Sequence, residues 1–286
     1  MKEPMVPCSN SPQVCVVVTT RNNERTIEAC LKSIREQTYP NFELIVVDNF
    51  SWDRTPEIAR LFANVFCQAG PERSAQRNLG AMSTNARYVY FVDSDMELSP
   101  QVLEECVREA LLGRIAVIIP ELATGQGFWA RCKALEKQCY LGDDDMEAAR
   151  FVDRERFISI GGYDGRMVGG GEDWDMSQRL LSKFCVNAGR IRSVAYHNEG
   201  NLTLGETLRK KYYYGRTILV YRTLNRDKAK AQLRLIRPAF LSHRNLLIRE
   251  PLLALGMIFM KTLEFVAGGL GAMASKFTGQ DSLSVG

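Results

Sequence analysis

The feature that most constrains the fold is a series of short apolar runs separated by helical patterns. The first two runs are VCVVVTT (residues 14–20) and FELIVVD (42–48), and others lie at 63–69, 87–92 and 115–120. Apolar runs without alternation indicate strands that are covered on both faces. Between the runs, apolar residues recur every three or four positions, as in a helix. Strands that alternate with helices predict an α/β fold, with a mostly parallel sheet and flanking helices.

Acidic side chains follow two of these strands. Asp48 ends the second run, and Asp93, Ser94 and Asp95 follow the run at 88–92. Parallel sheets bind ligands at the carboxyl ends of their strands. Two carboxylates this close repel each other unless they are neutralised, and Mg²⁺ and Mn²⁺ prefer oxygen ligands. Asp and Ser also start ordinary turns, so spacing alone leaves a turn and a metal site open.

Further polar residues lie in the second half of the chain. A glycine-rich segment (161–171) leads into a predicted helix that begins with Glu172 and Asp173. The helix dipole favours acids there, which is a purely structural explanation, but a carboxylate at such a junction can also point into a cleft. His197 ends a short predicted strand; a lone histidine is more often packed than a ligand, although histidine is the commonest metal-binding side chain. Residues 121–150 have weak periodicity, and we expect a flexible loop that faces the site.

Composition narrows the class of protein. The chain has 286 residues, is 45% hydrophobic and has a net charge of +4, so a core is expected and nucleic acid is not indicated as a partner. Its eight cysteines include no CxxC pair, which argues against a disulfide framework or a zinc site and favours the cytoplasm. The first thirteen residues lack the apolar core of a signal peptide.

Five segments, in order, resemble the family 2 glycosyltransferases of the GT-A fold. They are VVVTTRNNERTIEACLKSIREQTYPNFELIVVDNFSWDRT, RSAQRNLGA, YVYFVDSDMELSP, GGYDGRMVGGGEDWDMSQRL and AYHNEG, and they span residues 13–200. The resemblance implies a GT-A Rossmann-like catalytic domain (1–205), with a nucleotide-sugar half at 13–119 and an acceptor half at 120–200. It implies transfer of a hexosyl group from a UDP- or GDP-sugar to a hydroxyl acceptor. One carboxylate base without a protein nucleophile would give inversion at the anomeric carbon.

The resemblance also implies roles for the matching residues. Asp93, Ser94 and Asp95 correspond to the DxD motif, which holds Mn²⁺ or Mg²⁺ on the donor diphosphate, and His197 corresponds to a position that often completes the metal site. Asp173 corresponds to the general base, with Glu172 beside it. The nucleotide-binding positions are Thr19, Arg21, Glu24, Asp48 and Arg77, together with Asp93 and Ser94. Asn49 and Phe50 stand where many members carry an acid and a glycine, which leaves the base of the nucleotide open.

Residues 206–286 are expected to form a basic, amphipathic helical extension. Between Glu206 and Arg249, twelve Lys or Arg residues accompany two acids. An apolar stripe of one helical face follows, formed by Leu252, Leu255, Phe259, Leu263, Val266 and Leu270. Lys261 and Glu264 interrupt this run, and each would cost about 2.5–3.5 kcal/mol at the centre of a bilayer. An interfacial helix is therefore favoured over a full membrane span.

Two explanations of this stripe remain open. It can bind an anionic membrane surface, which would place the protein peripherally on the inner face of the cell membrane and suggest a glycan or polyprenyl-linked acceptor. Alternatively, it can pack on the catalytic domain or form a homodimer. Trp174, Tyr212 and Tyr213 are candidate acceptor contacts, because tyrosine favours interfaces and aromatic rings can stack on sugars.

Two other functions are weighed against glycosyl transfer. A sugar nucleotidyltransferase needs a glycine-rich, basic triphosphate loop near the first strand, and TTRNNERT (19–26) has no glycine. A catalytically silent protein could keep the fold in order to hold a nucleotide or a glycan. The presence of Asp93, Asp95, Asp173 and His197 together argues against it.

Overall fold

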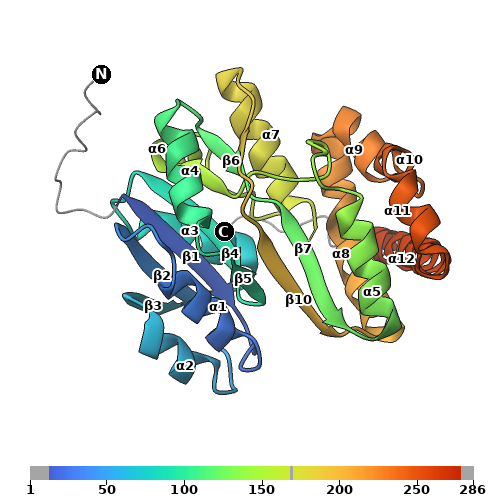
Figure 1. Ribbon diagram of the computed structural model, residues 1–286, viewed down its shortest axis with the longest axis horizontal. Coiled ribbons are helices and arrows are strands. Elements are labelled where there is room, and N and C mark those ends of the chain that lie inside the picture. Colours follow the sequence, from blue (N-terminus) through green and yellow to red (C-terminus); the bar gives the residue numbers. More distant parts are fainter. Residues whose placement is uncertain (1–12, 168–169, 278–286) are drawn as a thin grey trace.

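A seven-stranded sheet forms the centre of the protein (Figure 1). The computed structural model describes residues 13–167 and 170–277, so parts of the predicted glycine-rich segment and of the C-terminal extension lie outside it. The strands of the sheet are β1 (Val14–Thr20), β2 (Phe42–Asp48), β3 (Val65–Gln68), β4 (Tyr88–Asp93), β6 (Ala116–Ile118), β8 (Phe151–Asp153) and β9 (Gly189–Arg190). Their order is β3-β2-β1-β4-β8-β6-β9, and only β8 runs antiparallel to its neighbours. The predicted α/β fold with a mostly parallel sheet is confirmed.

Helices cover both faces of this sheet, which explains the continuous apolar runs. One face is covered by α1 (Ile27–Arg35), α2 (Thr55–Phe62) and α4 (Val102–Leu111), and the other by α3 (Arg73–Met82), α6 (Arg154–Ser159) and α7 (Glu172–Phe184). Along β1, Val14, Val16 and Val18 join the first core, whereas Cys15 and Val17 join the second. All seven residues of β1 are buried, so a polar side chain has no solvated face on this strand.

A smaller sheet extends the fold beyond the seven strands. It contains β5 (Met96–Leu98), β10 (Ala195–Asn201) and β7 (Glu121–Gln126), in the order β5-β10-β7, and β7 leads into α5 (Gly127–Gln138). The expectation of a flexible loop over 121–150 is therefore wrong for its first half. The periodicity of α5 is weak because the helix buries charged residues such as Glu136 in ion pairs with neighbouring helices, instead of presenting one apolar face.

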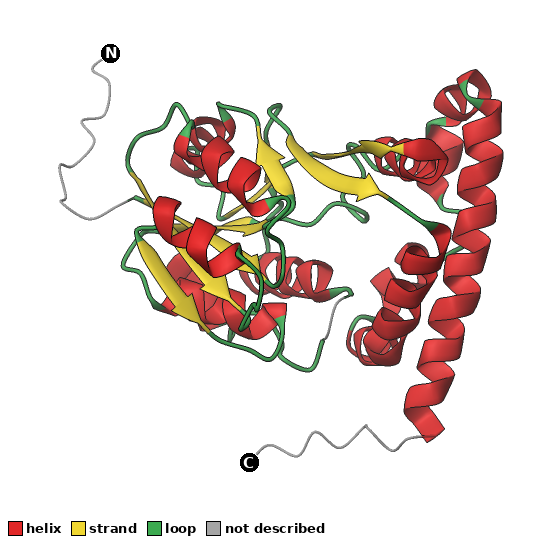
Figure 2. Ribbon diagram, turned by 90° about the horizontal axis from the view of Figure 1, so that it is seen from below, coloured by secondary structure: helices red, strands yellow, loops and turns green. Residues whose placement is uncertain are grey.

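Five helices follow the small sheet. They are α8 (Leu204–Leu224), α9 (Arg226–Gln232), α10 (Pro238–Ser242), α11 (Arg244–Arg249) and α12 (Pro251–Phe277). The long helix α12 runs along one flank of the molecule and packs on α8 and α5 (Figures 1 and 2). Glycines bring α8 and α12 into backbone contact, because a Cβ at Gly215 would lie 2.1 Å from the carbonyl oxygen of Gly268, and one at Gly271 would lie 2.0 Å from that of Tyr212.

An ordinary surface helix buries its apolar face and exposes its charged residues, whereas α12 buries two charged residues and exposes an apolar face. Lys261 and Glu264 are buried on the face that meets the rest of the protein, beside Met257 and Met260. Five of the six residues of the predicted apolar stripe, all but Leu263, are at least 50% exposed. The extension therefore does pack on the catalytic domain, but through the face opposite the stripe.

Substitution at the glycine contact tests this helix crossing. Gly215→Ala is expected to lower the free energy of unfolding by about 1–3 kcal/mol, because the added methyl group overlaps the Gly268 carbonyl. Gly269→Ala is the matched control, since Gly269 is exposed on α12 and a Cβ there meets nothing within 4 Å. That variant should be neutral or gain up to about 1 kcal/mol from helix propensity. Urea unfolding measures both, and equal stabilities would contradict the crossing.

Candidate active site

The predicted site residues converge at the carboxyl ends of the central parallel strands. In the register of the sheet, Thr20 at the end of β1 lies opposite Asp48 of β2, and Thr19 lies opposite Asp93 of β4. Residues that are far apart in sequence therefore share one edge of the sheet, as the strand-end rule predicts. The hydroxyls of Thr19 and Thr20 are buried there without a hydrogen-bond partner in the described part of the chain.

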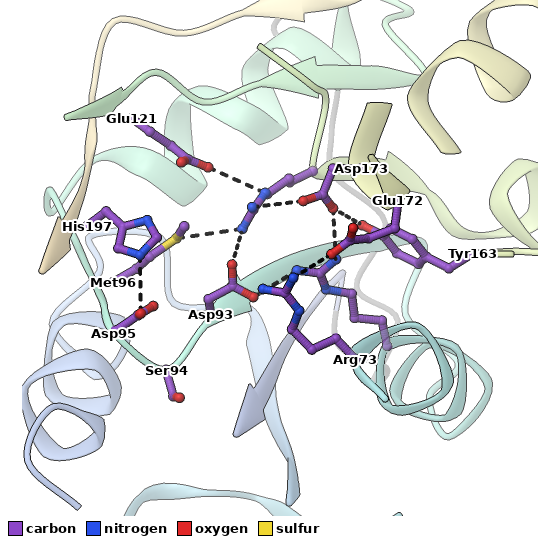
Figure 3. Close-up of polar contacts among 12 residues, drawn as sticks. Arg73, Asp93, Ser94, Asp95, Met96, Glu121, Tyr163, Glu172, Asp173 and His197 are labelled. Carbon is purple, nitrogen blue, oxygen red and sulfur yellow. Dashed lines mark hydrogen bonds and ion pairs between the residues drawn. The ribbon is translucent and has the colours of Figure 1, made fainter. Parts of the chain in front are cut away.

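Asp93 and Asp173 are joined by Arg77 and Arg150. We call these four residues the arginine–aspartate cluster (Figure 3). Arg77 of α3 donates to Asp93 Oδ1 at 2.8 Å and to Asp173 Oδ1 at 2.9 Å. Arg150, which precedes β8, donates to Asp93 Oδ2 and to Asp173 Oδ2, both at 2.9 Å. The hydroxyl of Tyr163 also donates to Asp173 Oδ1 at 2.9 Å. The cluster thus fixes the end of β4 against the first turn of α7.

The electrostatics of the cluster keep Asp93 ionised. Burial by itself would raise the pKa of Asp93, but the guanidinium groups of Arg150 and Arg77 hold that pKa well below 3.8. Arg77 is 0% exposed, so its charge is neutralised by carboxylates rather than by water. Glu172 is buried beside the cluster and accepts from Arg73 at 2.8 Å. Arg77, expected beside the nucleotide, thus binds two carboxylates in this structure.

Asp95 and His197 form a second polar pair on the other side of Asp93 (Figure 3). His197 Nε2 lies 3.2 Å from Asp95 Oδ2, and Lys137 Nζ lies 3.1 Å from His197 Nδ1. Because an ammonium group can only donate, Nδ1 is assigned as the acceptor and Nε2–H as the donor to Asp95. Burial opposes the charge on Asp95, but His197 lowers the pKa of Asp95 overall.

Asp95 and His197 have the ligand types of a divalent metal site, but His197 Nε2 could bind a metal only after it gives up the proton now directed at Asp95. Asp95 Oδ1 is buried and has no hydrogen-bond partner among the described residues. A carboxylate oxygen and an imidazole nitrogen suit Mn²⁺, and a hard cation would satisfy the orphaned oxygen. Asp93 accepts one hydrogen bond at each oxygen, from Arg77 and from Arg150, and in the described part of the chain none links it to His197, so it lies outside the Asp95–His197 pair. Within the described residues, no group of three or more His, Cys, Asp or Glu side chains is arranged to hold a metal ion.

The other predicted nucleotide-binding residues lie in the loops after β1, β2 and β4. Asp48 is fully buried and accepts from the Ser51 amide and from Gln68 Nε2, both at 2.9 Å, so it shapes the loop after β2. Glu24 is exposed, and its carboxylate accepts from the Arg54 amide at 3.2 Å. Arg21 is exposed. The hydroxyl of the buried Ser94 accepts from Asn23.

The predicted acceptor residues occupy two different places. Trp174 lines a cavity of about 310 Å³ together with Asp93, Asp173 and His197, and its indole donates to the Met146 carbonyl at 3.0 Å. Tyr212 and Tyr213 are exposed on α8 and do not line this cavity. The hydroxyl of Tyr213 donates to Glu72 at 2.6 Å, which links α8 to the start of α3.

Sequence reasoning missed three contributors to the site: Arg73, Arg150 and Tyr163. Tyr163 lies within GGYDGRMVGGGEDWD, one of the segments that carry the resemblance, so it could have been singled out. Arg150 lies outside the segments that carry the resemblance, so no motif in the sequence singled it out. It reaches Asp93 because β8 pairs antiparallel with β4, and this long-range pairing leaves no local pattern in the sequence.

Residues 15–173 match the family described as Glycosyl transferase family 2, and the chain belongs to this family. The first curated relatives, two Bacillus subtilis glycosyltransferases, are matched over about a third of their own lengths, 31% and 33%. The GalNAc(5)-diNAcBac-PP-undecaprenol beta-1,3-glucosyltransferase of Campylobacter jejuni is 24% identical over 229 residues, which cover 76% of this chain and 66% of that protein.

The family match covers residues 15–173, and a solved structure is similar over a larger part of the chain. The mannosyltransferase PcManGT from Pyrobaculum calidifontis, in complex with GDP-Man and Mn²⁺, superposes with a TM-score of 0.61. The match covers 93% of this chain and 88% of that one at 17% identity. The fold is therefore the GT-A fold.

Removal of one arginine tests the role of the cluster in stability. Arg77→Met is expected to lower the free energy of unfolding by about 3–5 kcal/mol, because the buried Asp93 and the half-buried Asp173 are left with Arg150 as their shared counter-ion. Arg54→Met is the control, since Arg54 forms an exposed ion pair with Glu57 that should contribute at most about 1 kcal/mol. Chemical denaturation compares the two variants. A loss for Arg77→Met no larger than that for Arg54→Met would show that the cluster does not support the fold.

Proposed function

We propose that this protein is a metal-dependent, inverting glycosyltransferase that moves a hexosyl group from a UDP- or GDP-sugar to a hydroxyl of a lipid-linked glycan. The observation that carries the proposal is that Asp173 and His197, which is paired with Asp95, line the same cavity. Family membership and the GT-A fold support it, and so does the nucleotide sugar with Mn²⁺ in the PcManGT complex.

The donor is proposed to bind in the half of the chain at residues 13–119. The partnerless hydroxyls of Thr19 and Thr20 would hydrogen-bond to the nucleotide, and the loops that carry Arg21 and Asp48 would surround its base and ribose. Asp95 and His197 would hold a divalent cation, which as a Lewis acid stabilises the negative charge of a diphosphate leaving group.

Asp173 is proposed to act as the general base of the acceptor half, residues 120–200. A carboxylate offers about four acceptor positions, and Arg77, Arg150 and Tyr163 occupy three of them. The remaining position can take the proton of an acceptor hydroxyl while the three donors fix the orientation of the group. The neighbouring Glu172 is buried in its ion pair with Arg73, which favours a single displacement with inversion.

The experiment that tests this function is a thermal-shift panel of UDP, GDP, ADP and CMP, each with and without Mn²⁺. A ligand that binds only the folded state raises the melting temperature, by several degrees when it is far above its Kd. We expect UDP or GDP to raise it, and to do so only with Mn²⁺. If none of the four nucleotides shifts the transition, the proposed donor class is wrong.

Two variants separate the roles of the site residues in the same assay. Asp95→Ala should abolish the Mn²⁺-dependent shift, because it removes the orphaned oxygen. Asp173→Asn should retain the shift but lower turnover of the nucleotide sugar by about 10²–10⁴-fold, the usual contribution of a general base. Loss of nucleotide binding in Asp173→Asn, with turnover preserved at saturation, would instead make Asp173 a donor ligand.

The exposed face of α12 is proposed to bind the inner face of the cell membrane. Pro251–Ser275 is long and apolar enough to span a bilayer by length and composition. However, Lys261 and Glu264 are held in ion pairs against α5, which favours a helix that lies in the interface. The Campylobacter jejuni relative is named for a PP-undecaprenol acceptor, and a membrane-bound enzyme would meet an acceptor of this kind.

Vesicle binding tests the membrane proposal without disturbing the packed face. The variant Leu255→Ser/Phe259→Ser/Val266→Ser should lose at least tenfold in co-sedimentation with anionic vesicles, because each side chain contributes burial energy only in the interface. The variant Leu111→Ser/Leu112→Ser is the control, since these leucines are similarly exposed but lie at the C-terminal end of α4, away from α12.

Two results would contradict membrane binding. The first is that the wild-type protein stays in the supernatant with anionic vesicles at low salt. The second is a dimer in sedimentation velocity that the triple substitution converts to a monomer, which would assign the apolar face to a second copy of the chain.

A further inference from the structure

The cavity that contains the catalytic acids has a second group of lining residues that the proposed chemistry does not use. Its lining also includes four cations, which we call the cation group. They are Lys133 of α5, Lys211 of α8, Lys261 of α12, and Arg237 in the segment before α10. Three helices and the segment before α10 thus place four cations in one wall of the cavity.

The acids within reach do not balance these cations. Lys133 Nζ lies 2.8 Å from Glu136 and 3.3 Å from Glu264. Lys261 pairs with the same two carboxylates, at 3.3 Å from Glu264. Glu136 also accepts from the Tyr140 hydroxyl at 2.6 Å. Two carboxylates therefore serve four cations.

Lys211 carries most of the positive charge that remains, because Arg237 Nη1 donates to the Tyr140 hydroxyl at 2.5 Å and lies 4.0 Å from Glu136. Among the described residues, no side chain forms an ion pair or a hydrogen bond with the Lys211 ammonium. Burial, helped by repulsion from Lys133 and Lys261, lowers the pKa of Lys211 to about 8, although Glu264 and Glu136 oppose this. Arg237 is 7% exposed, and its Nε is buried without an acceptor. Arg237 Nε is a buried donor without a partner, which is costly, and Lys211 is a half-buried cation without an ion pair among the described residues. This wall of the cavity is therefore suited to an anion.

The place of the cation group favours the acceptor over the donor as the source of that anion. The proposed donor residues lie at the ends of β1, β2 and β4, whereas the cation group lies on α5, α8 and α12 and in the segment before α10. Lys261 faces the cavity from the buried side of α12, and Leu255 and Phe259 are exposed on that helix. One helix thus offers a cation to the cavity and an apolar surface to the outside, which suits a ligand with a phosphate head and a hydrocarbon chain.

We propose that the cation group binds the phosphate or diphosphate that links the acceptor glycan to its lipid, with Lys211 and Arg237 as the main ligands. This inference rests on the proposed function, because it needs an acceptor in the cavity. The phosphate would accept hydrogen bonds from the Lys211 ammonium and from Arg237 Nε, which lacks an acceptor, and it would reduce the net positive charge of this wall. With the phosphate held there, the sugar end of the acceptor would extend along the cavity toward Asp173.

The test uses the full chain in EDTA, so that the metal-dependent donor site does not compete for diphosphate. Binding of inorganic pyrophosphate and of farnesyl diphosphate is measured by calorimetry at pH 7. Lys211→Met should weaken both by about tenfold or more, as expected for loss of a charge-assisted hydrogen bond. Arg209→Met removes a cation from the exposed side of the same helix and should change either affinity by less than twofold.

Stability provides a second readout for the same variant. Lys211→Met removes a half-buried cation that has no ion pair among the described residues, so its melting temperature should equal or exceed that of the wild type while binding is lost. Unchanged affinity for both probes in Lys211→Met would overturn the inference. Equal affinity for pyrophosphate and farnesyl diphosphate would overturn the lipid part of it.

Failure of this inference can be told apart from failure of the proposed function. If UDP or GDP binds with Mn²⁺ but Lys211→Met binds both diphosphate probes normally, the glycosyltransferase proposal stands and the phosphate site is wrong. If no nucleotide binds but the probes depend on Lys211, the phosphate site stands and the donor proposal fails.

Discussion

Two arginines that each bridge the same two aspartates hold the candidate active site of this protein together. Asp93 ends β4 and Asp173 lies in the first turn of α7. Without the arginines between them, these two carboxylates would repel each other. Arg77 comes from α3 and Arg150 from the start of β8, so four elements meet in one set of ion pairs. Because each arginine is a planar donor that stays charged, the geometry is set before any ligand binds.

This cluster also divides the cavity into two electrostatic regions. Around Asp93 and Asp173, cations and carboxylates are matched and the local charge is close to neutral. Around Lys211, cations exceed acids and donors lack partners. A neutral region suits a hydroxyl nucleophile, and a positive one suits an anionic group, so one cavity can orient a ligand with two chemically different ends.

Much of the fold could be predicted because its signals are local. The buried runs of β1, β2 and β4 gave the parallel sheet, and the strand-end rule placed Asp48 and Asp93 at one edge. The pairing of Asp95 with His197 agrees with the family resemblance. Arg150 could not be predicted, because it depends on the antiparallel pairing of β8 with β4. The helix α5 was missed because Glu136 is buried by ion pairs, and hydrophobic periodicity does not detect burial of that kind.

The glycine contacts between α8 and α12 have a further consequence for the geometry of catalysis. The close approach of the two backbones at Gly215 and Gly271 would be lost if α12 rolled about its own axis, so the crossing favours one orientation of the helix. If the exposed apolar side of α12 lies in the bilayer and Asp173 is the base, as proposed, this crossing sets the distance between the membrane surface and the base. Only an acceptor hydroxyl at that distance from the membrane would reach the base. The protein would then select its acceptors by the length of their glycan.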